Sequence, residues 1–179
     1  MAKVTSRIIA DRLVELGMVT RARADEALAK IATYSPDHDA EIAPEDVVDF
    51  LYEFGVTVVV HGDDVTNLED SYRGILESAA ACSGEVTVTN VQLVEEDDEE
   101  ILKFRLNGEP TSWIVDHLMD HYLDRLTVWE SIDVLGPGGD DPRVFHTIID
   151  DGHTADIYVL ATPAQAAALR ADFGLALEP

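Results

Sequence analysis

Two histidines and an aspartate in the stretch DHLMDHYLD, residues 116–124, have the types and the spacing of a metal site. His117 and His121 stand four residues apart, so on a helix both imidazoles share one flank, next to Asp124. Two imidazoles and a carboxylate one turn further on can bind a zinc ion. The glutamate that follows the first histidine in the protease motif is missing. The stretch therefore fits two interpretations, a zinc site or the solvated flank of a helix, and we favour the second.

A second polar group, His61-Gly62-Asp63-Asp64, follows an apolar run that predicts a buried strand at residues 56–60. Polar groups at the end of such a strand commonly line ligand sites in open sheets. Asp63 and Asp64 beside His61 can hold Mg²⁺ or serve as acid and base. The alternative is a tight turn in which Asp64 caps the next helix. We favour the turn.

Six consecutive acids form the third candidate, at the tip of an expected hairpin. They are Glu95, Glu96, Asp97, Asp98, Glu99 and Glu100. One interpretation is a solvated loop with no binding function. The other is a projecting anionic surface that attracts and selects a basic protein. Asp63, Asp64, Asp150 and Asp151 are weaker candidates for the same partner-binding surface.

The charge of the chain is strongly negative and uneven. The net charge is −24 over 179 residues, which disfavours binding to phosphate backbones and to anionic lipid. Residues 1–36 carry six basic and four acidic residues, a net of +2, so the remaining 143 residues carry −26. A basic protein partner, solubility in a salty cytoplasm and compositional drift all remain explanations for this acidity.

The elements that must position these residues begin with a helical hairpin. Residues 5–18 and 20–33 have helical spacing of apolar residues, with Thr5 or Ser6 and then Thr20 as N-caps. The hairpin invites a helix-turn-helix interpretation in which Arg21, Arg23 and Lys30 contact DNA phosphates. We favour an ordinary packed hairpin, because these few cations must overcome the charge of the acidic body.

The remainder of the chain predicts an α+β fold. After a third helix that begins at Pro44, the expected order is βαβββαββα, a mostly antiparallel sheet with helices packed on it. Asn107-Gly108 predicts a type I′ hairpin turn. A helix at about 117–133 is expected to bury Val115, Leu118, Met119, Tyr122, Leu126 and Trp129. The predicted domains are a helical hairpin at 1–36 and an acidic α+β domain at 44–179, or a single domain.

Other features of the sequence narrow the function. Cys82 is the only cysteine, and charged residues interrupt the apolar positions near the start of the chain. We therefore expect a cytoplasmic protein without a signal peptide or a membrane span. The sequence has no nucleophile elbow, phosphate loop, dinucleotide fingerprint or zinc finger.

The leading prediction is a non-enzymatic acidic binding protein without a cofactor. It is an immunity-type or regulatory inhibitor that covers a basic partner, such as a toxin or a nucleic-acid-handling protein. A small zinc-dependent hydrolase or metal-sensing protein is the alternative. A DNA-binding regulator that uses the helical hairpin is a further one.

Overall fold

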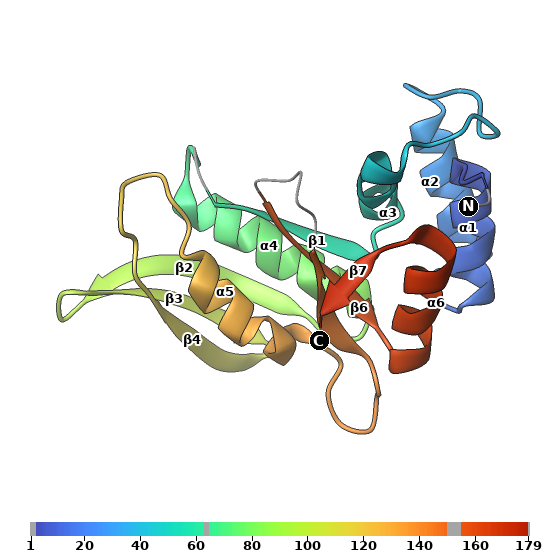
Figure 1. Cartoon of the computed structure of the whole chain (residues 1–179). Helices are drawn as coiled ribbons and strands as arrows, with labels where there is room; N and C mark the ends of the chain where they lie inside the picture. The colour runs from blue at the N-terminus through green and yellow to red at the C-terminus, as the bar shows by residue number, and fades with distance from the viewer. Residues whose placement is uncertain (1–2, 63–64, 150–154, 179) are drawn as a thin grey trace.

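The computed structural model describes residues 3–62, 65–149 and 155–178, which form helices and two antiparallel sheets (Figure 1). This arrangement confirms the α+β class and the predicted order of elements, apart from one added strand. Asp63, Asp64, Asp150 and Asp151 lie outside the described residues. Within the described ranges, no helix combines the length and the apolar character needed to cross a membrane.

One end of the molecule is helical. The helices α1 (Ser6–Glu15) and α2 (Arg21–Ile31) form the predicted hairpin, and the hydroxyls of Thr5 and Thr20 cap them by accepting from backbone N–H groups. A short 3-10 turn, η1 (Pro44–Asp46), leads into α3 (Val47–Glu53). Apolar side chains of α1 and α2 pack in the same core as α3. The predicted domain boundary between residues 36 and 44 stays a prediction.

A four-stranded sheet follows, in the order β1-β6-β5-β7. Its strands are β1 (Thr57–His61), β5 (Val144–Ile149), β6 (Ala155–Ala161) and β7 (Ala176–Glu178). The helix α6 (Pro163–Phe173) joins β6 to β7 and begins with a capping box between Thr162 and Gln165. The sequence did not predict β7, because three residues are too few to show an alternating pattern.

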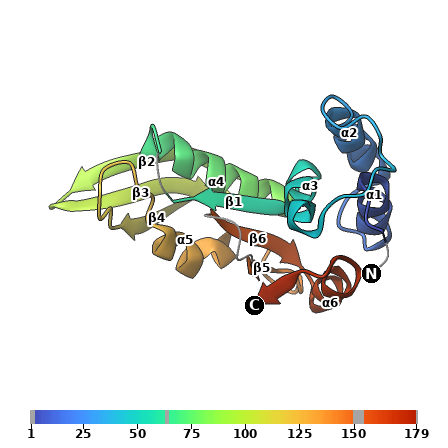
Figure 2. The ribbon, with the colours of Figure 1, turned by 45° about the horizontal axis from the view of Figure 1, so that its top comes forward.

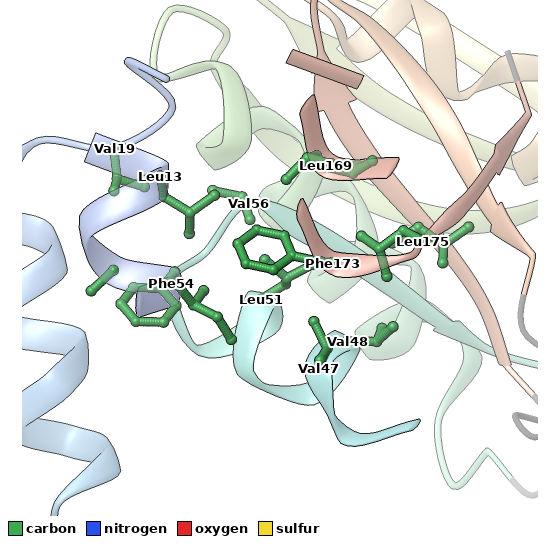
Figure 3. Close-up of a cluster of buried hydrophobic side chains, with 14 of the residues drawn as sticks. Leu13, Val19, Val47, Val48, Leu51, Phe54, Val56, Leu169, Phe173 and Leu175 are labelled. Atoms are coloured by element: carbon green, nitrogen blue, oxygen red, sulfur yellow. The ribbon is translucent and has the colours of Figure 1, made fainter. Parts of the chain in front are cut away.

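The four-stranded sheet has a core on each face. Ile157 and Val159 lie in the same core as side chains of α1, α2, α3 and α6. Figure 3 shows side chains of α1, α3 and α6 converging there. Tyr158 and Leu160, which alternate with them, face the second core. That core includes side chains of α4 (Leu68–Ser83) and of a three-stranded meander.

The meander consists of β2 (Val88–Glu96), β3 (Glu99–Leu106) and β4 (Glu109–Val115). Asn107 and Gly108 join β3 to β4 with φ values of 51° and 83°, as expected for a type I′ turn. Asp97 and Asp98 join β2 to β3 in the same way, with φ values of 51° and 66°. Both hairpins are therefore tight two-residue turns.

The predicted helix at about 117–133 is wrong over its first half. The helix α5 (Arg125–Ser131) begins only after Asp124, and η2 (Ile132–Leu135) continues it as a 3-10 turn. His121 has a left-handed φ of 69°, which is incompatible with a continuous helix. Asp124 caps α5, since its carboxylate accepts from the backbone N–H of Thr127 at 3.0 Å.

Candidate functional site

His117, the first predicted zinc ligand, lies in a polar network. Its side chain is only 4% exposed, and Nε2 lies 2.8 Å from the hydroxyl of Tyr72. Its Nδ1 lies 2.5 Å from a carboxylate oxygen of Glu100. Because both ring nitrogens already have partners, this imidazole joins β3 and α4 to the segment after β4.

The backbone of Asp124 adds a further partner to this network. Its N–H donates to the Tyr72 oxygen at 2.9 Å, so the Tyr72 hydroxyl proton is free to be donated to His117 Nε2. In the tautomer that carries its proton on Nδ1, the His117 imidazole accepts from Tyr72 and donates to Glu100. Burial raises the pKa of the Tyr72 phenol, so the hydroxyl keeps its proton near neutral pH.

The carboxylate of Asp124 organises the same region. Besides capping α5, it accepts from the hydroxyl of Thr127 at 2.6 Å and from the backbone N–H of Asp116 at 2.9 Å. Burial alone would raise the pKa of Asp124, but these hydrogen bonds outweigh it and hold the pKa below its ordinary value. The carboxylate of Asp124 therefore has structural partners of its own.

His121 does not join His117 in a ligand set. Its Nδ1 lies 3.1 Å from the backbone oxygen of Val65, whereas His117 contacts Tyr72 and Glu100. Among the described residues, no group of three or more His, Cys, Asp or Glu side chains is placed to hold a metal ion. The helical geometry that suggested zinc is absent from residues 117–124.

The segment between β4 and the end of α5 exposes large apolar side chains. Of the six residues predicted to form a buried helical face, Val115 is buried, but the other five are exposed. The exposed fractions are 88% for Leu118, 56% for Met119, 40% for Tyr122, 62% for Leu126 and 56% for Trp129. We call these five residues the apolar segment. Large apolar side chains that gather in one exposed region are typical of surfaces that bind other proteins.

The acidic run lies at a hairpin tip, as predicted. Glu96 pairs with Lys103 at 2.5 Å, and Glu100 contacts His117. Glu95, Asp97, Asp98 and Glu99 are exposed and form no ion pair with any described residue. We call these four residues the acidic turn, which projects at the far end of the molecule from α1 and α2 (Figures 1 and 2).

The apolar segment and the acidic turn are connected. Glu100, next to the acidic turn, pairs in register with Val115 at the end of β4. The same residue contacts His117, which directly precedes Leu118. Glu100 therefore links the acidic turn to the start of the apolar segment, through its pairing with Val115 and its hydrogen bond to His117.

A groove of about 1210 Å³ lies among α3, β1 and α4. Its lining includes four carboxylate side chains, which belong to Asp46, Asp49, Glu53 and Asp70. Glu53 pairs with Lys30, and Asp70 pairs with Arg73. His61 of the second sequence candidate also lines it. The groove was not evident from the sequence, because its lining comes from residues as far apart as Tyr34 and Ile157. The density of acids around Pro44 was the one available signal.

The cations proposed to contact DNA make internal contacts. Arg21 pairs with Asp11 at 2.7 Å and Lys30 pairs with Glu53 at 2.6 Å. Arg23 donates to the backbone oxygen of Gly55 at 3.1 Å. These contacts give the DNA-binding interpretation no support, because each cation is directed toward the protein itself.

Comparisons of the chain with protein-family models, with curated proteins and with solved structures found no significant match.

Proposed function

We propose that this chain is a non-enzymatic acidic cytoplasmic binding protein that covers a basic protein partner. An immunity-type or regulatory inhibitor of a toxin or a nucleic-acid-handling protein has this chemistry. The observation that carries the proposal is the apolar segment with the acidic turn connected to it. No zinc or other cofactor is part of the proposal.

The apolar segment and the acidic turn have different physical roles in binding a partner. Burial of Leu118 and Trp129 against a partner removes apolar area from water, which slows dissociation. The carboxylates of the acidic turn act at longer range, because they attract a basic surface before contact. The net charge of −24 makes a basic partner the favourable one.

The test begins with native mass spectrometry of the protein purified at low salt from its own host. A basic protein that copurifies at fixed stoichiometry supports the proposal and supplies the partner for kinetics. The Leu118→Ser/Trp129→Ser variant should then dissociate about tenfold faster or more. Reversal of the acidic turn to lysine should slow association and flatten its dependence on salt.

Matched controls exist on the same chain. Val134 and Val144 are also exposed, at 49% and 43%, and belong to neither surface. Val134→Ser/Val144→Ser should therefore bind like the wild type. A partner that binds the Leu118→Ser/Trp129→Ser and lysine variants with unchanged rates would contradict the proposal.

A further inference from the structure

We propose that a pocket beside Trp129 receives the ammonium group of one lysine side chain of the basic partner. This inference rests on the proposed function and names the kind of residue that the partner presents next to the apolar segment. The pocket has a volume of about 320 Å³, at the small end of the range of roughly 300–1,000 Å³ that is usual for ligand pockets. Its size therefore suits one side chain better than a stretch of chain.

The pocket lies between the four-stranded sheet and the helical turns of α5 and η2. Phe145 and Thr147 of β5 and Tyr158 of β6 line it from the face of the sheet that carries the second core, and Thr147 pairs with Tyr158 in register. Trp129 of α5 lines it from the other side. Since Trp129 also belongs to the apolar segment, a partner that covers this segment lies beside the pocket.

Two carboxylates at the pocket carry charge that no cation balances within the described part of the chain. Glu130 of α5 forms no ion pair there. The carboxylate of Asp133, in η2, accepts from the backbone N–H of Phe145 at 3.3 Å and from no other described group. This contact holds the Asp133 carboxylate beside β5 without neutralising it. The pocket differs in this respect from the groove, where Glu53 and Asp70 have basic partners.

Tyr158 gives an independent indication of a ligand. It is 1% exposed and lines the pocket, and its hydroxyl has no hydrogen-bond partner among the described residues. A buried hydroxyl without a partner costs free energy, so few are retained in folded proteins. Burial raises the pKa of the phenol, so the oxygen stays uncharged near neutral pH. A donor on a long, thin side chain would supply the missing hydrogen bond.

Lysine fits these groups better than arginine does. An ammonium group has three donors that point in different directions, so it can bond acceptors from separate elements, here Glu130, Asp133 and Tyr158. A guanidinium group is planar and favours the two oxygens of one carboxylate. The methylene stem of lysine can lie against the apolar surfaces of Trp129 and Phe145, whose rings also attract a cation.

The test titrates the full-length protein with Nα-acetyl-lysine N-methylamide and follows the indole N–H signals of both tryptophans by NMR. The signal of Trp129 should shift in a saturable way, with a dissociation constant on the order of 1 mM for so small a probe. The signal of Trp113, which does not line the pocket, is the internal reference. The norleucine derivative has a similar stem without the ammonium and should bind at least about tenfold more weakly. Equal binding of the norleucine derivative, or tighter binding of the arginine derivative, would overturn the inference.

Tyr158→Phe separates ligand binding from stability. It removes only the hydroxyl, so it should weaken binding of the lysine probe about fivefold. The midpoint of urea unfolding should stay equal or rise, because the hydroxyl has no partner within the described protein. Tyr52→Phe, at an exposed position that does not line the pocket, should change neither quantity. Unchanged probe binding by Tyr158→Phe would contradict the inference.

Charge variants separate the pocket from general attraction. Glu130→Gln/Asp133→Asn should weaken probe binding about tenfold, whereas Asp25→Asn/Glu26→Gln on α2 removes equal charge and should have little effect. If the pocket variant does not fold by circular dichroism, Glu130→Gln alone, at an exposed position, serves instead. Equal weakening by the pocket and control variants would show that the probe follows net charge, and would rule the pocket out.

One further variant distinguishes this inference from the proposed function. Leu118→Ser should bind the lysine probe like the wild type, because Leu118 does not line the pocket, and should dissociate faster from the partner. Faster dissociation of this variant, together with no shift of the Trp129 signal by the probe, would overturn the pocket and leave the proposed function standing. A saturable Trp129 shift that only the pocket variants weaken supports the ammonium site even if the apolar segment fails its own test.

Discussion

The hydroxyl of Tyr72 lies 2.8 Å from Nε2 of His117 and joins residues that are 45 positions apart in the chain. The side chain of Tyr72 is fully buried in the second core, and its oxygen also accepts from the backbone of Asp124. This single hydroxyl therefore connects α4 to both ends of the segment that carries Leu118, Met119 and Tyr122. Its contacts hold that segment in a non-helical conformation, which leaves its apolar side chains exposed.

Removal of the Tyr72 hydroxyl should destabilise the protein. Tyr72→Phe leaves the Asp124 N–H and His117 Nε2 without this partner, which costs about 1–3 kcal/mol of unfolding free energy. Urea unfolding followed by circular dichroism measures the change. The matched control is Tyr52→Phe, at a residue that is 48% exposed, with an expected change within about 0.5 kcal/mol. Equal stability of the two variants would contradict the network.

Asp124 should contribute stability that depends on pH. Its folded pKa is lowered, so the contribution is present above the unfolded pKa of about 3.9 and is lost as pH falls through the folded value. Asp124→Asn should be less stable than the wild type by roughly 1 kcal/mol at neutral pH, and the gap should close in acid. Unfolding free energies measured from pH 7 down to about pH 2 test this.

The Thr127→Val variant tests whether the hydrogen bonds of the Asp124 carboxylate cause this pH dependence. Thr127→Val removes the hydroxyl that donates to the Asp124 carboxylate. In this background the loss of unfolding free energy that Asp124→Asn causes at neutral pH should shrink. A loss that stays constant from neutral to acidic pH would show that the charge of Asp124 does not stabilise the fold.

The acidic turn should gain stability from glycine. Asp98 has a φ of 66°, a left-handed conformation that glycine adopts without steric cost. Asp98→Gly should therefore raise the unfolding free energy by about 0.5–1 kcal/mol. Glu99→Gly removes the same charge from a strand position without a left-handed φ and should be destabilising. If both variants gained stability equally, charge relief and not backbone conformation would be the cause.

The two tryptophans should report separately on the surface and the core. Trp129 is 56% exposed, whereas Trp113 is 7% exposed and packs edge-to-face on Phe104. Trp129→Phe should remove the red-shifted emission that acrylamide quenches, with a stability change within about 0.5 kcal/mol. Trp113→Phe should instead remove the blue-shifted emission and destabilise the protein. Shielded emission from both residues in the isolated chain would contradict the exposed apolar segment.

Local signals in the sequence predicted much of the fold. Thr5, Thr20 and Asn107-Gly108 act through contacts within a few residues, so their caps and their turn were identifiable without tertiary information. The helix before Arg125 was predicted wrongly for the opposite reason. The contacts of Asp124 with Tyr72 and of His117 with Glu100 span 52 and 17 residues, and they outweigh the local helical pattern.

The candidate surfaces also differ in how far the sequence alone could predict them. The acids from Glu95 to Glu100 were recognisable because they are consecutive and lie between two alternating strands. The residues of the apolar segment were recognised in the sequence, but they were predicted to be buried and are exposed. The groove depends on the relative placement of α3, β1 and α4, which no single stretch of sequence encodes.

The charge of the molecule is unevenly distributed along its length. Residues 1–36, which include α1 and α2, have a net charge of +2, while the acidic turn lies at the opposite end of a strongly negative molecule (Figures 1 and 2). The protein therefore carries an electric dipole moment along its long axis. A basic surface does not only attract such a molecule but also exerts a torque on it. Such a torque would turn β2 and β3 toward a basic surface and α1 and α2 away from it.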